Sequence, residues 1–160
     1  MRKIIFHILI LIGVAVAQFG LNRFISVAGF APNIILIAVV CIGLLRGTLS
    51  GMMYGFILGL AWDVMTVDLF GSYSLLLTII GYISGCLSNT WDETKTIPQV
   101  ALVLGMSLVF IFGQELIRQS LSYDPFKIRI ALINIIGVLY TMLVAPVVFA
   151  VVRVLFRRFD

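Results

Sequence analysis

Long apolar runs separated by short polar stretches dominate this sequence. A hydrocarbon core of about 30 Å is crossed by roughly 20 residues of α-helix, and each run approaches that length. Within each run the apolar residues are continuous, whereas the strands of a membrane barrel alternate between apolar and polar positions. The pattern therefore predicts six membrane helices, at residues 4–21, 30–45, 48–65, 70–87, 100–117 and 130–152.

Composition leads to the same fold class. Apolar residues make up 62% of the chain, charged residues make up 11%, and the mean hydropathy is +1.19. A soluble domain carries about 25% charged residues. A chain of 160 residues cannot enclose this much apolar surface, so lipid must cover the remainder. We expect an all-α integral membrane protein in which residues 1–160 form a single transmembrane domain.

The basic residues predict the orientation. With six spans both termini lie on one side, and that side carries seven of the eleven Lys and Arg residues. Positive charge is retained on the inner side of a membrane, so both termini are predicted to be cytoplasmic. The basic residues lie at the ends of apolar runs and form no basic face, so nucleic acid is not an expected partner.

The N-terminal run allows a second interpretation. Arg2 and Lys3 precede an apolar stretch that reaches the small-residue triplet at residues 15–17. This order is also typical of a secretory signal with its cleavage site. Cleavage would leave five spans and an external N-terminus.

Glycines at a regular spacing mark the third and fourth runs. They are Gly47, Gly51, Gly55 and Gly59, followed in the same register by Asp63, and then Gly81 and Gly85. Residues four apart lie about 40° from one another around a helix, so the first set forms one smooth face. Such a face lets a second helix approach closely, either from the same chain or from a partner.

Polar residues inside or near the runs are the functional candidates of a membrane protein. They include Gln18, Asn33, Asp63, Gln114 and Asn134. Asp63 is expected to face protein rather than lipid. Glu115 lies three residues before Arg118, so a local ion pair within one helix is the simpler interpretation there.

Two further features concern the helix ends. Arg46 begins a connection of only three residues between the second and third runs, and so short a link forces an antiparallel hairpin. Pro146, well inside the last run, should kink that helix.

No catalytic, metal or cofactor site is predicted. The single histidine shares no motif with a serine or cysteine that could act as a nucleophile. Neither a metal-ligand spacing nor a phosphate-binding loop is present in the sequence. Cys41 and Cys86 lie inside apolar runs and indicate no disulfide framework.

The central block resembles the family of rod shape-determining protein MreD. The resemblance rests on Pro32-Asn33, Arg46-Gly47, the glycine series ending in Asp63, the triplet at residues 69–71, and Gly81 with Gly85. It is firm over residues 32–85. Six spans and a basic tail also fit the family, although its members more often carry aspartate at the position of Asn33.

The resemblance implies a non-enzymatic component of the bacterial cell-elongation machinery in the cytoplasmic (inner) membrane. The expected partner is an MreC-like bitopic membrane protein, and the wider assembly includes the MreB filament, RodA and a penicillin-binding transpeptidase. The expected role is to link these partners to peptidoglycan synthesis and so maintain rod shape. Our hypothesis is that the Gly51–Gly55–Gly59 face, or the lipid-facing side beside it, seats a partner's helix.

A rival function comes from another class of protein. Six short helices with a glycine-rich hairpin also resemble the substrate-binding subunit of an energy-coupling factor type vitamin transporter, an architecture that MreD-like proteins are thought to share. Such a subunit needs a pocket with several convergent polar groups. Asp63, Trp62 and Tyr73 are available for such a pocket, but these are few polar groups for recognising a vitamin.

Overall fold

The computed structural model describes five stretches of the chain and one isolated residue. These are residues 9–18, 32–66, 69–88, 96–121 and 128–159, together with Gly20. Residues 4–8 of the first expected span, and the side chain of Asn134, lie outside what is described.

Helices account for nearly all of the described residues. A helix at Leu9–Gln18 is followed by α2 (Ile34–Arg46), α3 (Thr48–Met65), α4 (Ser72–Cys86), α5 (Thr96–Leu121) and α6 (Ile128–Phe159). No strand occurs within the described ranges. The all-helical fold expected from the continuous apolar runs is confirmed.

Three of the helices are long and apolar enough to cross a membrane. They contain the segments Thr48–Met65, Ile97–Ser120 and Gly137–Phe156. The helices at Leu9–Gln18, Ile34–Arg46 and Ser72–Cys86 are apolar but shorter. By length and composition, the described part of the chain is therefore a helical bundle in which three helices could cross a membrane.

Helix α2 is the centre of the bundle. It contacts α3, α4, α5 and α6, and every residue from Ile34 to Leu44 is buried. A helix that is apolar on all sides is stable only when protein or lipid surrounds it completely. The uniformly apolar sequence of α2 therefore accounts for its position.

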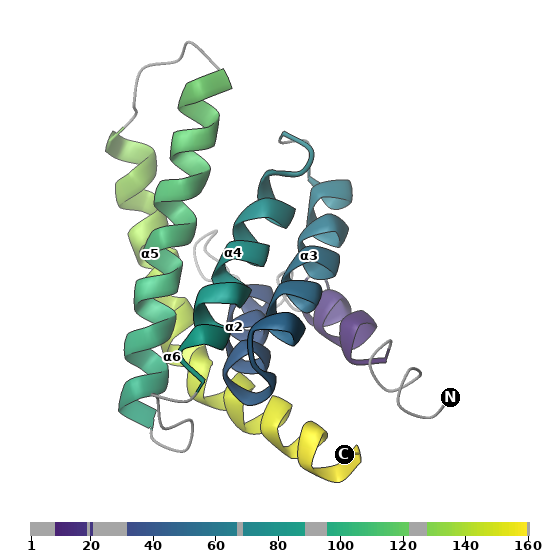
Figure 1. Cartoon of the computed structure of the whole chain (residues 1–160). Coiled ribbons are helices and arrows are strands. Elements are labelled where there is room, and N and C mark those ends of the chain that lie inside the picture. Colours follow the sequence, from purple (N-terminus) through teal and green to yellow (C-terminus); the bar gives the residue numbers. More distant parts are fainter. Residues whose placement is uncertain are drawn as a thin grey trace.

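The other helices surround α2 in two pairs. Figure 1 shows α3 and α4 as one antiparallel pair, and α5 with the first part of α6 as a second pair beside it. Farther along, α6 changes direction and its last turns pass across the end of α2. Pro146 lies inside α6, where it removes a backbone hydrogen bond and crowds the preceding turn. The bend expected from that proline is present.

Candidate functional site

The glycine face of α3 lies against α4 of the same chain. A methyl group added to Gly51 would fall on the carbonyl oxygen of Gly81, and one added to Gly81 would fall on the carbonyl oxygen of Gly51. A methyl group on Gly55 would likewise meet the carbonyl oxygen of Leu77. Only glycine allows two helix backbones to approach this closely. The α3 glycine face is thus occupied by α4.

The close approach continues to both ends of the hairpin. A methyl group on Gly59 would meet the Cα atom of Ser74, and one on Gly85 would meet the Cα atom of Thr48. These contacts lie on either side of the Gly51–Gly81 crossing. The two helices are therefore in backbone contact over most of their shared length.

Gly43 of α2 joins the same contact, and the sequence analysis overlooked it. A methyl group on Gly43 would lie 3.0 Å from the carbonyl oxygen of Gly81 and 3.0 Å from Cβ of Ser84. A methyl group on Gly51 would lie 2.9 Å from Cα of Gly43. Glycines of three helices therefore meet at one point. Gly43 lies one step of four residues before Gly47, so the spacing itself was the signal that could have found it.

Gly47 differs from the other glycines of the series because it forms the turn between α2 and α3. Its φ angle is 81°, in the left-handed region that side chains other than glycine rarely adopt. Its N–H donates a hydrogen bond to the carbonyl oxygen of Gly43 (2.8 Å). A methyl group on Gly47 would meet nothing within 4 Å. The requirement for glycine here is conformational.

Asp63 is buried near the end of α3, with 3% of its surface exposed, and it caps the beginning of α4. The N–H of Tyr73 donates to Oδ1 of Asp63 (3.1 Å), and the N–H of Ser74 donates to Oδ2 (3.0 Å). Amide groups in the first turn of a helix have no partner within that helix. A carboxylate satisfies them and also interacts favourably with the positive end of the helix dipole. Asp63 thus joins the end of one helix to the start of the next.

Aromatic rings gather beside this cap. Trp62 stacks on Tyr73 with ring centroids 5.0 Å apart and an interplanar angle of 13°. Phe110 of α5 contacts both rings, at centroid distances of 6.2 Å from Trp62 and 5.8 Å from Tyr73. The cluster therefore attaches α5 to the Asp63 end of the hairpin. Trp62 and Tyr73, which the rival interpretation needed for ligand recognition, are engaged with each other.

Asn33 caps the beginning of α2. Its Oδ1 accepts a hydrogen bond from the N–H of Leu36 (2.9 Å), and its own N–H donates to Oγ1 of Thr141 on α6 (3.0 Å). The short polar side chain thus satisfies one donor of the first turn. Thr141 lies in an apolar stretch, and its part in this contact had no signal in the sequence.

Gln18 supplies the remaining cap of α2 from the first helix. Its Oε1 accepts from the N–H groups of Ile34 (2.7 Å) and Ile35 (3.2 Å), and its Nε2 donates to the carbonyl oxygen of Pro32 (3.2 Å). Gln18 is buried. The sequence placed it among the polar candidates without assigning it a role.

The remaining polar candidates lie on α2 and α5. The guanidinium of Arg46, at the end of α2, lies 4.8 Å from the ring centroid of Phe156 on α6, a geometry typical of a cation–π interaction. Glu115 is half-buried and Arg118 is exposed, both on α5. Arg46 therefore lies at the opposite end of α3 from the Asp63 cap.

The arrangement is one of helix packing and helix capping. Within the described residues, no group of three or more His, Cys, Asp or Glu side chains could hold a metal ion. Cys41 is buried and Cys86 is exposed, and neither forms a disulfide within the described residues. The polar groups gathered here bind helix ends, so their chemistry is structural.

A family model for rod shape-determining protein MreD matches residues 1–159. The chain belongs to the MreD family. The match extends far beyond residues 32–85, where the resemblance was firm in the sequence, and it confirms that resemblance. Among curated proteins and solved structures, no match was found.

Membership of the MreD family bears on function at a coarse level. It supports a role in determining rod shape, as part of a shape-determining system rather than as a member of a known enzyme family. Together with three helices of spanning length, it indicates a membrane protein. The expected likeness to substrate-binding subunits of energy-coupling factor transporters is unsupported.

Proposed function

We propose that this chain is a non-enzymatic membrane component of the bacterial cell-elongation complex, which links MreC- and MreB-type partners to peptidoglycan synthesis. The observation that carries the proposal is the match of residues 1–159 to the MreD family model. Its direct partner is an MreC-like bitopic protein. The MreB filament, RodA and a penicillin-binding transpeptidase belong to the same assembly.

The protein lies in the inner membrane, crosses it with all six helices and keeps both termini in the cytoplasm. Two considerations support six spans despite the short helices. A short spanning helix is accommodated by local thinning of the bilayer or by neighbouring helices, and α2 is surrounded by protein. The distribution of basic residues supports the orientation.

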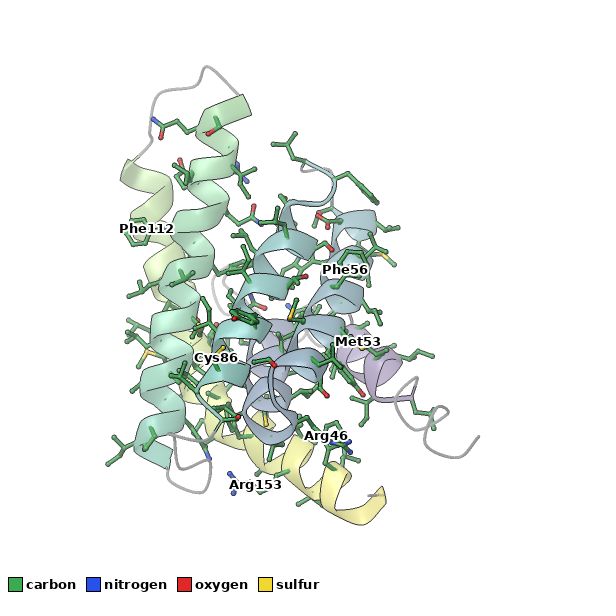
Figure 2. All side chains as sticks on the ribbon, viewed as in Figure 1. Arg46, Met53, Phe56, Cys86, Phe112 and Arg153 are labelled. Atoms are coloured by element: carbon green, nitrogen blue, oxygen red, sulfur yellow. The ribbon has the colours of Figure 1, made fainter. Side chains whose placement is uncertain are left out.

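The surface proposed for the partner's helix is the outward side of the α3–α4 hairpin. Because α4 occupies the glycine face, a partner helix fits the lipid-facing side beside it. Figure 2 shows Met53 and Phe56 projecting from α3 on the side away from α5. The exposed residues of the two helices include Leu49, Met53, Phe56 and Leu60 on α3, and Leu75, Ile79, Tyr82 and Cys86 on α4.

The spacing of these residues supports helix docking. In both rows the steps are four, three and four residues, which is the spacing of the seam residues in helices that pack along their length. A docking surface that is already rigid also loses less conformational entropy when a partner binds. The backbone contacts between α3 and α4 supply that rigidity.

The test is purification in mild detergent from the native host, with co-purified proteins and small molecules identified by mass spectrometry. We expect recovery of an MreC-like bitopic protein with wall-synthesis enzymes. The paired variant Phe56→Ala/Tyr82→Ala should lower that recovery several-fold. Phe112→Ala, which removes an even more exposed ring from α5, serves as the control and should leave recovery unchanged.

Two results would overturn parts of this proposal. Recovery of a coupling membrane subunit with paired ATPases, or of a tightly held vitamin, would contradict the elongation role itself. Full recovery of the MreC-like protein by the Phe56→Ala/Tyr82→Ala variant would leave the role intact but exclude the outward side of the hairpin as the docking surface.

A further inference from the structure

The signal-like order of residues near the N-terminus has no part in the proposed function. Two basic residues, an apolar run and small residues at positions 15 and 17 form the pattern that a signal peptidase recognises, with its cut between Ala17 and Gln18. Hydrolysis of that bond by water would leave a carboxylate on Ala17 and a free amine on Gln18. The structure shows how the bond is held.

The bond between Ala17 and Gln18 lies inside a helix. The helix at Leu9–Gln18 contains the whole small-residue triplet and the residue that follows it. Proteases cut exposed and mobile segments, because the chain must open to enter their active sites. Cutting of a folded protein is therefore limited by the population of a locally opened state.

Gln18 fastens this end of the helix. Its side chain is 2% exposed. Its Oε1 accepts from the N–H groups of Ile34 (2.7 Å) and Ile35 (3.2 Å), and its Nε2 donates to the carbonyl oxygen of Pro32 (3.2 Å). The chain around the bond cannot become extended without breaking these hydrogen bonds and withdrawing the cap from α2.

Apolar packing holds the rest of the first helix. Ile10 is 6% exposed and belongs to the core, and Leu11 and Val14 pack against that core. Ala15 and Ala17, the two small residues that a peptidase must admit, are half-buried. The segment that resembles a signal is therefore docked on the bundle along its described length.

We propose that the Ala17–Gln18 bond is a signal peptidase site that the Gln18 cap keeps inaccessible, so that residues 1–17 remain part of the working protein. Loss of the cap converts the first helix into a cleavable signal. This inference rests on the proposed orientation, in which the first helix runs outward and Gln18 lies at its outer end. It does not depend on the docking surface proposed on α3 and α4.

The first test is made in cells. The full-length protein, tagged at its C-terminus, is expressed in the native host and purified in mild detergent, and its intact mass is measured. We expect the wild type to keep residues 1–17 and a readily measured fraction of Gln18→Ala to begin at position 18. Gln18→Glu keeps a side-chain oxygen for the α2 amides and should stay intact. Asp63→Ala removes a different cap, that of α4, and should also stay intact.

The second test uses purified signal peptidase on the detergent-solubilised proteins, where both ends of every helix are accessible. We expect Gln18→Ala to be cut about ten-fold faster than the wild type, because loss of a helix cap shifts the opening equilibrium by about that factor. The new N-terminus is identified by mass spectrometry.

Three results would overturn the proposal. They are a wild type that begins at position 18 in cells, equal rates for the wild type and Gln18→Ala with purified peptidase, and cutting of Asp63→Ala as fast as Gln18→Ala. Cutting of Gln18→Ala in detergent but not in cells would overturn the orientation on which the proposal rests, and would leave the role in rod shape intact.

Discussion

Gly51 and Gly81 face each other so closely that a methyl group on either would fall on the carbonyl oxygen of the other. The relationship is reciprocal, and Gly43 of α2 lies beside it. Without a hydrophobic driving force between helices in lipid, such close packing is a main source of helix association. The α3–α4 hairpin therefore depends on the absence of side chains at these positions.

Gly81→Ala should destabilise the protein substantially. The added methyl group would meet the backbone of Gly51, which cannot move aside as a flexible side chain can. Overpacking of a close contact costs about 1–3 kcal/mol. Thermal unfolding in detergent, followed by circular dichroism, should show a lowered midpoint. Gly105→Ala is the matched control, because a methyl group there meets nothing within 4 Å and helix propensity favours alanine. Equal midpoints for the two variants would contradict the packing role.

Replacing Asp63 should loosen the beginning of α4. In Asp63→Ala the N–H groups of Tyr73 and Ser74 lose their acceptors, and loss of a helix cap costs about 0.5–2 kcal/mol. Asp63→Asn keeps one oxygen acceptor but no charge, so its loss should be smaller. The rate of hydrogen exchange at the Tyr73 and Ser74 amides, measured by mass spectrometry, should be lowest in the wild type, higher in Asp63→Asn and highest in Asp63→Ala. Unchanged exchange in Asp63→Ala would exclude the cap.

Gln18→Leu should destabilise the junction of the first helix with α2. The N–H of Ile35 would lose the oxygen that accepts from it, and the N–H of Ile34 would keep only the carbonyl oxygen of Pro32. An unsatisfied buried group costs about 1–3 kcal/mol. The free energy of unfolding in a denaturing detergent titration measures this loss. Gln119→Leu makes the same chemical change at an exposed position of α5, so it should have little effect.

The contact of Arg46 with Phe156 is measurable as a coupling energy. In a double-mutant cycle of Arg46→Gln and Phe156→Leu, we expect the two losses of stability to be non-additive by about 0.5–2 kcal/mol, the range of cation–π interactions. The free energy of unfolding of the four proteins gives the coupling. A coupling energy of zero would show that the last turns of α6 are held against α2 by apolar burial alone.

Much of this protein follows from sequence patterns that act along one helix. Continuous apolar runs require lipid or a protein interior around them, so helical membrane character was predictable from composition and run length. The short link around Gly47 specified a turn, and Pro146 specified a bend, because both act through local backbone geometry. The glycine spacing showed that one smooth face exists on α3 and that α4 carries small residues as well.

The tertiary structure alone decided what each of those faces meets. Periodicity places residues on one side of a helix but contains no information about the neighbour across it, so the spacing of Gly51 and Gly55 left a choice between α4 and a partner. The caps made by Asp63 and Gln18 join residues that are 10–17 positions apart in the chain, and Thr141 reaches Asn33 across 108 positions. The backbone donors at a buried helix end need an acceptor. Helix packing supplies that acceptor by bringing a side chain from a distant part of the sequence, so such pairs form only when the helices pack.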